Sequence, residues 1–282
     1  MFTEQQQQEM YSSFSQSLHG WEASPFKSKR HQLDIQRLLV EDRTQLYLVR
    51  AGDGQQMVAK RHSDWATYYL ELRAFELLGN QAPIPELIAA SDSGQFIVME
   101  YVPDSWETKT TSDLCEVARA LGRLHACGSR NARFLKSFTQ EATLGFLIRN
   151  THSYDWVEDV EALREALSLA AFKLGESYVP IHLGDFKESH VRARDGECML
   201  IDLETVSIGD IESFDILSLL NIAPDKKLDS SEWVALATAY IAGRDSVGEL
   251  SLSVSETLTT LHLTAVALGL PSSLVDSIPL TC

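Results

Sequence analysis

The stretch HLGDFKESHVRARDGECMLIDLET, residues 182–205, decides the fold of this chain of 282 residues. It places a lysine and a histidine two and five residues after Asp185, and a second aspartate, Asp202, within an apolar run that is typical of a strand. The Asp-Gly pair at 195–196 favours the positive φ angles of a tight hairpin turn. We therefore expect a loop that carries Asp185, followed by a hairpin whose second strand holds a buried Asp202.

The chain changes character near Pro103. Before it, alternating apolar residues and turn signals predict five antiparallel strands and one helix, the helix over 64–80. After it, apolar residues at helical spacing predict core helices over 111–128 and 155–174. We expect an α+β fold of two lobes. The predicted divisions are an N-terminal extension at 1–32, a first lobe at 33–103 and a mainly helical lobe with the hairpin at 104–282.

Composition restricts the partners and the compartment. The chain is 44% hydrophobic, enough for a large core, and its net charge of -16 argues against nucleic acid, which is bound mainly through Lys and Arg. Surplus acid suits a cationic partner, although it serves solubility equally well. No apolar run reaches the ~20 residues of a membrane span, the N-terminus lacks the features of a signal peptide, and the four cysteines form no CxxC pair. We expect a cytoplasmic monomer or homodimer with reduced thiols and no membrane partner.

The motifs and the order of the elements resemble the aminoglycoside phosphotransferase family, small-molecule kinases of the protein-kinase-like superfamily. That family runs His-Gly-Asp, then Asn, Ile-Asp, Gly-Asp and Asp. This chain has Leu183-Gly184-Asp185, His190, Ile201-Asp202, Gly209-Asp210 and Asp215. Leucine thus replaces the histidine of the family, His190 replaces its asparagine, and the neighbouring His182 is expected to be a buried strand residue. The resemblance implies a protein-kinase-like fold and transfer of the γ-phosphate of ATP to a hydroxyl group.

The resemblance also implies roles for residues of the loop and hairpin. Asp185 would orient the acceptor hydroxyl and accept its proton, and Lys187, as in protein kinases, would meet the transferred phosphate. Asp202 would hold Mg²⁺. His190 would be either a second ligand, which would shift preference toward Mn²⁺, or a brace of the loop. Asp215 would steady the loop through hydrogen bonds, or simply cap a helix. Each residue alone has such an ordinary structural reading, so the joint spacing carries the prediction.

In the first lobe, Lys60 matches the lysine of the third strand that contacts the α and β phosphates. Its partner would be a glutamate on the following helix. We prefer Glu71, because Glu76 lies five residues further on and should face elsewhere. A lysine in a strand is usually just part of an exposed face, so its position before the helix is the reason for this assignment.

The stretch FIVMEYVP, residues 96–103, resembles the interlobe hinge of the family. Backbone groups of Glu100 and Val102 would meet the adenine base, and Met99 would line the inner wall of its pocket. The turn between the first two strands has no glycine, so no glycine-rich phosphate loop is present. Arg43 and Thr44 could donate to phosphates from that turn, as could the polar residues of any surface hairpin.

The acceptor site is expected in the helical lobe. In the family the acceptor binds to this lobe, where the helix over 155–174 would carry five acidic residues: Asp155, Glu158, Asp159, Glu161 and Glu165. They could bind an amine-bearing molecule, or form a solvated face. We predict an ATP-dependent phosphotransferase for aminoglycosides or other antibiotics, amino sugars or amino alcohols. The alternative is a kinase-like protein that binds a nucleotide or metabolite with little or no catalysis.

Overall fold

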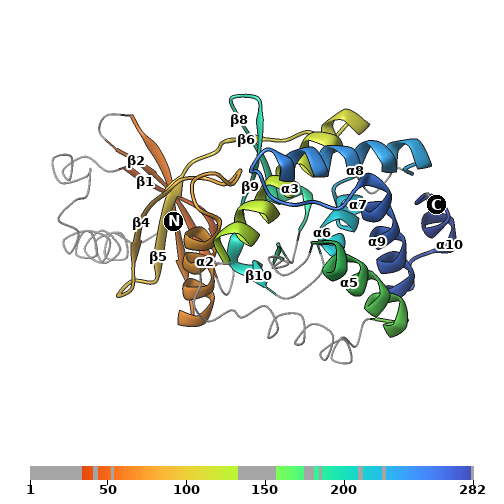
Figure 1. The fold of residues 1–282 in the computed structure, drawn as a ribbon. Coiled ribbons are helices and arrows are strands. Elements are labelled where there is room, and N and C mark those ends of the chain that lie inside the picture. Colours follow the sequence, from red (N-terminus) through yellow and green to blue (C-terminus); the bar gives the residue numbers. More distant parts are fainter. Residues whose placement is uncertain are drawn as a thin grey trace. The chain divides into compact units, whose positions relative to one another are not determined.

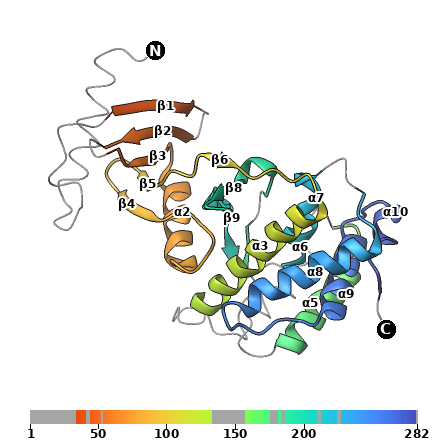
Figure 2. The same ribbon diagram turned by 90° about the horizontal axis from the view of Figure 1, so that it is seen from above.

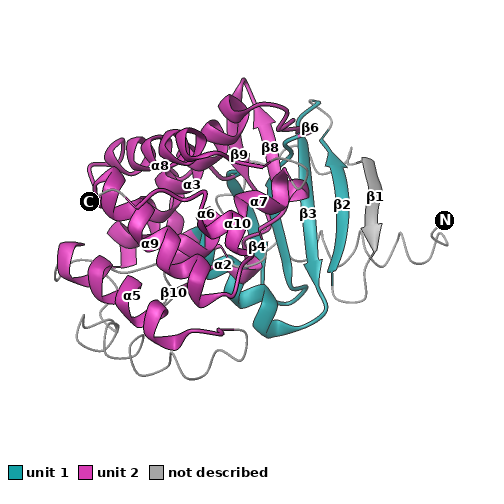
Figure 3. Ribbon diagram, turned by 90° about the vertical axis from the view of Figure 1, so that its right-hand side faces the viewer, with its two compact units in different colours: residues 1–75, 85–102 teal, residues 76–84, 103–282 magenta. Residues whose placement is uncertain are grey.

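Figure 1 shows the computed structural model of the chain. The structure describes residues 34–40, 44–51, 54–132, 157–174, 181–183, 186–208, 212–223 and 227–280. The chain divides into two compact units, coloured separately in Figure 3. The first unit is Met1–Phe75 with Pro85–Val102, and the second is Glu76–Ile84 with Pro103–Cys282.

The first unit contains a five-stranded sheet in which every neighbouring pair of strands is antiparallel, as the sequence predicts. The strands, in their order across the sheet, are β1 (Asp34–Val40), β2 (Thr44–Arg50), β3 (Gln56–His62), β5 (Phe96–Glu100) and β4 (Leu87–Ser91). Apolar side chains on one face form a core cluster that includes Tyr47, Ala59 and Val98. Because strand residues alternate between faces, the neighbours of Ala59 in β3 point to the opposite face.

Helix α2 (Trp65–Leu78) follows β3 directly. The Asp64 carboxylate accepts hydrogen bonds from the amide and the hydroxyl of Thr67, both at 2.8 Å, so it caps the helix, and these hydrogen bonds lower the pKa of Asp64. The helix ends at Leu78, and Gly79 after it has a φ of 66°, the left-handed conformation that glycine adopts without penalty. Its buried side chains include Tyr68, Glu71 and Leu78. A buried glutamate on an otherwise apolar face requires a partner.

The second unit is built mainly from helices. Their bounds are α3 (Thr111–Ala132), α5 (Val160–Leu174), α6 (Ser213–Leu217), α7 (Leu219–Ile222), α8 (Ser230–Asp245), α9 (Val254–Ala267) and α10 (Ser272–Val275). Helices α3 and α8 lie side by side, and α5 packs against α9 (Figure 2). A Cβ atom at Gly122 would lie 2.0 Å from the main-chain oxygen of Tyr240, and one at Gly243 would lie 2.1 Å from that of Arg119. The absence of these side chains lets α3 and α8 pack backbone against backbone.

The predicted hairpin is present in the second unit as β8 (Val191–Arg194) and β9 (Glu197–Leu200), with β6 (Asp104–Ser105) paired to β8. Its turn has the predicted positive φ angles, 52° at Asp195 and 81° at Gly196. A separate pair joins β7 (Ile181–His182) to β10 (Ser207–Ile208). The prediction that the second strand of the hairpin contains Asp202 is wrong, because β9 ends at Leu200.

The helix predicted over 155–174 begins later, at Val160. Asp159 explains the difference, since its carboxylate accepts the amides of Glu161 and Ala162 at 3.1 and 3.0 Å and thereby caps the first turn. Glu158 and Asp159 therefore precede the helix, and Asp155 lies outside the described residues. Within the described ranges, no helix has both the length and the apolar character needed to cross a bilayer.

Candidate active site

In the first unit, Lys60 and His62 lie on the face of β3 opposite the apolar cluster. Lys60 Nζ lies 3.0 Å from Oε2 of Glu71, and both residues are buried, with 5% and 1% of their surface exposed. Glu76 is exposed, as expected for its position on the helix. The structure therefore brings Lys60 together with Glu71, and burial in a region of low dielectric strengthens their attraction.

His62 is a third member of this cluster, and sequence reasoning missed it. Its Nε2 lies 2.8 Å from the same Glu71 oxygen that Lys60 contacts, and its side chain is buried. The available signal is the spacing, because a residue two positions from Lys60 in a strand must share its face. Glu71 thus holds two basic side chains from one strand.

The predicted hinge residues lie at the end of β5. Met99 and Val102 are buried, and Glu100 is half-buried. The amide of Glu100 donates to the carbonyl of Glu86 at 2.9 Å, so an adenine contact at this residue would have to use its carbonyl oxygen. Thr44 is the first residue of β2, while Arg43 lies outside the described residues.

In the second unit, Gly184 and Asp185 lie outside the described residues, but the chain on both sides of them is described. Leu183 and Phe186 are buried, with 0% and 2% of their surface exposed. Thr205 Oγ1 donates a hydrogen bond to the carbonyl of Leu183. The described residues on both sides of Asp185 are therefore anchored in the core. Lys187, just beyond Phe186, is exposed.

His190 and Asp202 form a contact next to the hairpin. The amide of Ile201 donates to the carbonyl of His190 at 2.9 Å, which extends the hairpin pairing and brings the two side chains together. His190 Nε2 lies 3.0 Å from Oδ2 of Asp202. The histidine side chain is 6% exposed and the aspartate side chain 30%, so Asp202 is half-buried rather than buried as predicted. Asp202 has left-handed backbone angles, φ 66° and ψ 69°.

Asp215 is a fully buried carboxylate of the second unit. It lies inside α6, beyond the cap position at Glu212, so the helix-cap reading is wrong. It accepts hydrogen bonds from His125 Nε2 at 2.8 Å, from His182 Nδ1 at 3.4 Å and from the amide of Leu183. The predicted hydrogen bonds to the loop are thus present. Burial alone would raise the pKa of Asp215, yet the hydrogen bonds from the two histidines outweigh it and lower the pKa to about 2.

His182 is half-buried rather than fully buried as predicted, with 17% of its side chain exposed. It pairs with Ser207 in the β7–β10 ladder, and this pairing directs its ring toward Asp215. Sequence reasoning also missed His125, which comes from α3, far from the motif in sequence.

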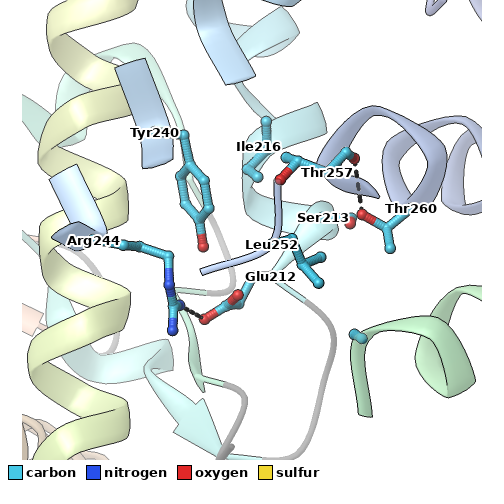
Figure 4. Close-up of a pocket in the computed structure, with 9 residues that line it drawn as sticks. Glu212, Ser213, Ile216, Tyr240, Arg244, Leu252, Thr257 and Thr260 are labelled. Carbon is cyan, nitrogen blue, oxygen red and sulfur yellow. Dashed lines mark hydrogen bonds and ion pairs between the residues drawn. The ribbon is translucent and has the colours of Figure 1, made fainter. Parts of the chain in front are cut away.

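A small pocket lies among the helices of the second unit (Figure 4). Its volume of about 20 Å³ holds about one water molecule. Glu212 and Arg244 form a buried ion pair on its wall, and the hydroxyl end of Tyr240 lies beside them (Figure 4). Its other lining residues are Ala170, Ser213, Ile216, Leu252, Thr257 and Thr260. A pocket of this size cannot accept a nucleotide or a sugar.

Residues 35–250 match the model of the phosphotransferase enzyme family. The chain belongs to this family. The predictions of this family, of a kinase-like α+β fold and of a phosphotransferase are therefore confirmed. No curated protein matches the sequence of this family member.

Solved structures share the fold of this phosphotransferase at low sequence identity. A choline kinase from Cryptosporidium parvum has a TM-score of 0.61 at 15% identity, with 96% of this chain and 90% of that chain covered. An ethanolamine kinase from Plasmodium vivax has a TM-score of 0.54 at 11% identity, covering 99% and 88%. A macrolide 2'-phosphotransferase type I has a TM-score of 0.51 at 13% identity, covering 98% and 96%.

Proposed function

We propose that this protein transfers the γ-phosphate of ATP to a hydroxyl group of a small cationic molecule. The observation that carries the proposal is the buried pair of Lys60 on β3 and Glu71 on the next helix. Catalysis of phosphoryl transfer consists mainly of positioning and charge neutralisation, and kinases use a lysine of the third strand, held by a helix glutamate, for the phosphates of the nucleotide. Burying both charges is costly unless each serves the other.

In this proposal, residues 33–103 bind the nucleotide and residues 104–282 bind the acceptor. Lys60 contacts the α and β phosphates. The carbonyl of Glu100 and the amide of Val102 contact adenine, beside Met99. The carbonyl of Glu100 is used in this proposal because its amide already donates to the carbonyl of Glu86.

The half-exposed carboxylate of Asp202 fits a magnesium ion, because Mg²⁺ prefers oxygen ligands. A bound ion would neutralise charge on the transferring phosphate. His190 directs its Nε2 to the Asp202 carboxylate, and this geometry supports a brace more than a ligand. Mn²⁺, which accepts imidazole more readily, is therefore the less favoured ion.

The acceptor side of the proposal rests on the loop between Leu183 and Phe186. Asp185 orients the acceptor hydroxyl and takes its proton as the hydroxyl oxygen attacks phosphorus. The exposed ammonium group of Lys187 offsets charge on the phosphate during transfer. The anchoring of both ends of the loop supports this role, since a catalytic carboxylate must be held in place.

An amine-bearing alcohol is the acceptor class that we favour. The net charge of -16 favours a cationic molecule, and two structures of similar fold are named for choline and ethanolamine. The acidic row expected near α5 supports this less than the sequence suggested, because Asp159 caps the helix and Glu161 pairs with Arg164 at 2.8 Å.

A screen of acceptors with ATP and Mg²⁺, read by the mass gain of one phosphate on the acceptor, tests the proposal. Choline, ethanolamine, amino sugars, aminoglycosides and macrolides are the acceptors. The uncharged carbon isostere of choline is the matched control for the charge. We expect phosphorylation of an amine-bearing alcohol and little reaction of the isostere. Absence of product from every acceptor would contradict the proposed transfer.

Asp185→Asn separates binding from transfer. The variant should retain ATP affinity within about twofold and lose at least about a hundredfold in kcat, because the carboxylate acts mainly in the transition state. Calorimetry and the mass assay measure these quantities, with Asp276→Asn, at an exposed position, as the control. Turnover by Asp185→Asn comparable to that of the parent would rule out the assigned role.

The second candidate is nucleotide binding without transfer, which one observation favours. His190 stands where the family has a metal-binding asparagine, and it contacts Asp202. The two candidates differ in one result. ATP binding without a phosphorylated product from any acceptor supports nucleotide binding without transfer. A phosphorylated acceptor supports the phosphotransferase.

A further inference from the structure

Two buried side chains beyond the catalytic loop meet because α3 and α8 pack so closely. With glycine at positions 122 and 243, the helix backbones touch, and His125 of α3 reaches Tyr240 of α8. The Tyr240 hydroxyl lies 3.0 Å from His125 Nδ1. Their rings meet edge to face with centroids 5.7 Å apart, and only 0% and 3% of their surface is exposed.

The other ring nitrogen of His125 continues this contact toward the loop. His125 Nε2 lies 2.8 Å from Oδ2 of Asp215, and the same oxygen accepts the amide of Leu183. Asp215 is a carboxylate and can only accept, so Nε2 must carry the proton that it donates. The side chains therefore form an ordered chain from Tyr240 through His125 and Asp215 to the main chain two residues before Asp185.

The far end of this chain is held equally firmly. The Tyr240 side chain contacts Glu212 and Arg244, which pair with one another beside the small pocket (Figure 4). Arg244 also donates from Nε and Nη2 to the carbonyl of Leu250 at 3.1 and 2.9 Å. Burial raises the pKa of Tyr240 well above its ordinary value, so the phenol keeps its proton. Glu212 precedes α6, which carries Asp215, and the contacts therefore tie α6 to α8 twice.

We propose that His125 and Tyr240 are a positioning pair that holds the Asp215 carboxylate in the orientation needed to fix Leu183 and the loop carrying Asp185. The inference rests on the proposed function. Neither residue touches substrate in this proposal. Tyr240 occupies Nδ1 of the imidazole, which fixes the ring and aims the Nε2 proton at Asp215. A buried network in which every polar group has a partner is rigid, and removal of one member loosens the rest.

Tyr240→Phe removes one hydroxyl and retains the ring. We expect kcat to fall roughly fivefold, the rate equivalent of about one neutral hydrogen bond, with KM for ATP unchanged. His125→Asn, which cannot bridge both partners, should lower kcat by at least about tenfold. Tyr69→Phe is the matched control, because Tyr69 is half exposed on α2 and its ring is retained; its kcat should equal that of the parent.

Two NMR readouts test the pair directly. In the parent, the ¹⁵N shifts of His125 should show a proton on Nε2, and a proton on Nδ1 alone would overturn the proposal without the use of any variant. In Tyr240→Phe, the His125 shifts should change and the Leu183 amide should exchange with solvent at least about tenfold faster. Unchanged exchange at Leu183 in folded Tyr240→Phe would also overturn it.

A failure of the proposed phosphotransferase function can be distinguished from a failure of the positioning role. If the parent phosphorylates no acceptor, the proposed function fails, while the His125 proton and the Leu183 exchange still decide whether the pair positions the loop. If the parent is active and Tyr240→Phe changes the KM for ATP in either direction while kcat stays the same, the positioning role is wrong. A loss of kcat with faster Leu183 exchange supports it.

Discussion

Glu71 in the first unit and Asp215 in the second are both buried carboxylates that contact two basic side chains. Glu71 contacts Lys60 and His62, which come from a single strand. Asp215 contacts His125 and His182, which come from a helix and a strand, and it also accepts a main-chain amide. The two carboxylates share a chemistry but differ in what they hold.

The difference indicates two uses of a buried carboxylate. A lysine ammonium group is a point charge on a flexible stem, so Glu71 can hold Lys60 while the lysine also reaches a phosphate. A main-chain amide has no such freedom, so Asp215 fixes the path of the backbone at Leu183. We therefore interpret Glu71 as the support of a ligand-binding side chain and Asp215 as the support of a loop.

Asp215→Ala should have the largest effect on stability. It leaves the amide of Leu183 and Nε2 of His125 buried without their acceptor, and we expect a loss of about 3 to 5 kcal/mol in the free energy of unfolding. Urea denaturation followed by circular dichroism measures it. The exposed Asp276→Ala is the control and should change stability by less than about 0.5 kcal/mol. Equal stability of the two variants would contradict the role of Asp215 as an anchor.

Lys60→Met and Glu71→Gln should each remove one member of the buried ion pair, and the double variant should recover part of the loss. We expect a coupling free energy of about 2 kcal/mol from the double-mutant cycle in urea. Lys60→Met should also weaken ATP binding at least about tenfold, as measured by calorimetry. Strictly additive effects would show that the pair is not coupled in the folded protein.

Low pH should destabilise the parent through Asp215. Its pKa is about 2 when folded and 3.8 as an ordinary value, so the unfolded chain binds its proton first as the pH falls. The contribution of about 2 kcal/mol is fully present above about pH 4 and is lost as the pH falls through about 2. Urea midpoints of the parent and of Asp215→Asn at about pH 6 and about pH 2.5 measure it. The gap between the two proteins should narrow at low pH; a constant gap would assign the acid loss to other groups.

His62→Phe should have the smallest effect, about 1 kcal/mol, because Lys60 still offsets the charge of Glu71. ATP affinity should stay within about twofold, in contrast to Lys60→Met. His62→Gln, which keeps a side-chain N–H donor, should recover part of the stability. If His62→Phe weakens ATP binding as strongly as Lys60→Met, the histidine belongs to the nucleotide site, and Glu71 supports two ligand-binding side chains rather than one.

The sequence predicted the features that depend on local spacing. The family resemblance implied that Lys60 pairs with a glutamate of the next helix, and the helical period favoured Glu71 over Glu76. The hairpin turn followed from the Asp-Gly pair at 195–196. The family motif predicted the fold class because its residues occur together in the right order.

Features that depend on tertiary contacts could not be predicted in this way. His125 and Tyr240 are 115 residues apart, and only the close packing of α3 and α8 brings them together. Asp202 was placed in a strand because apolar neighbours on both sides hide a left-handed turn of the backbone. Asp159 looked like part of an acidic helix face, but a carboxylate at a helix start is better used as a cap.

The left-handed backbone at Asp202 restricts which changes an evolving chain can accept there. With φ at 66°, most side chains crowd the main chain, whereas glycine, asparagine and aspartate tolerate this region. An aspartate codon reaches asparagine or glycine by a single base change, and both exchanges remove the charge without disturbing the turn. The position can therefore lose its carboxylate in one genetic step and keep its fold. In a lineage released from selection for catalysis, it would drift to these residues while the hairpin survived.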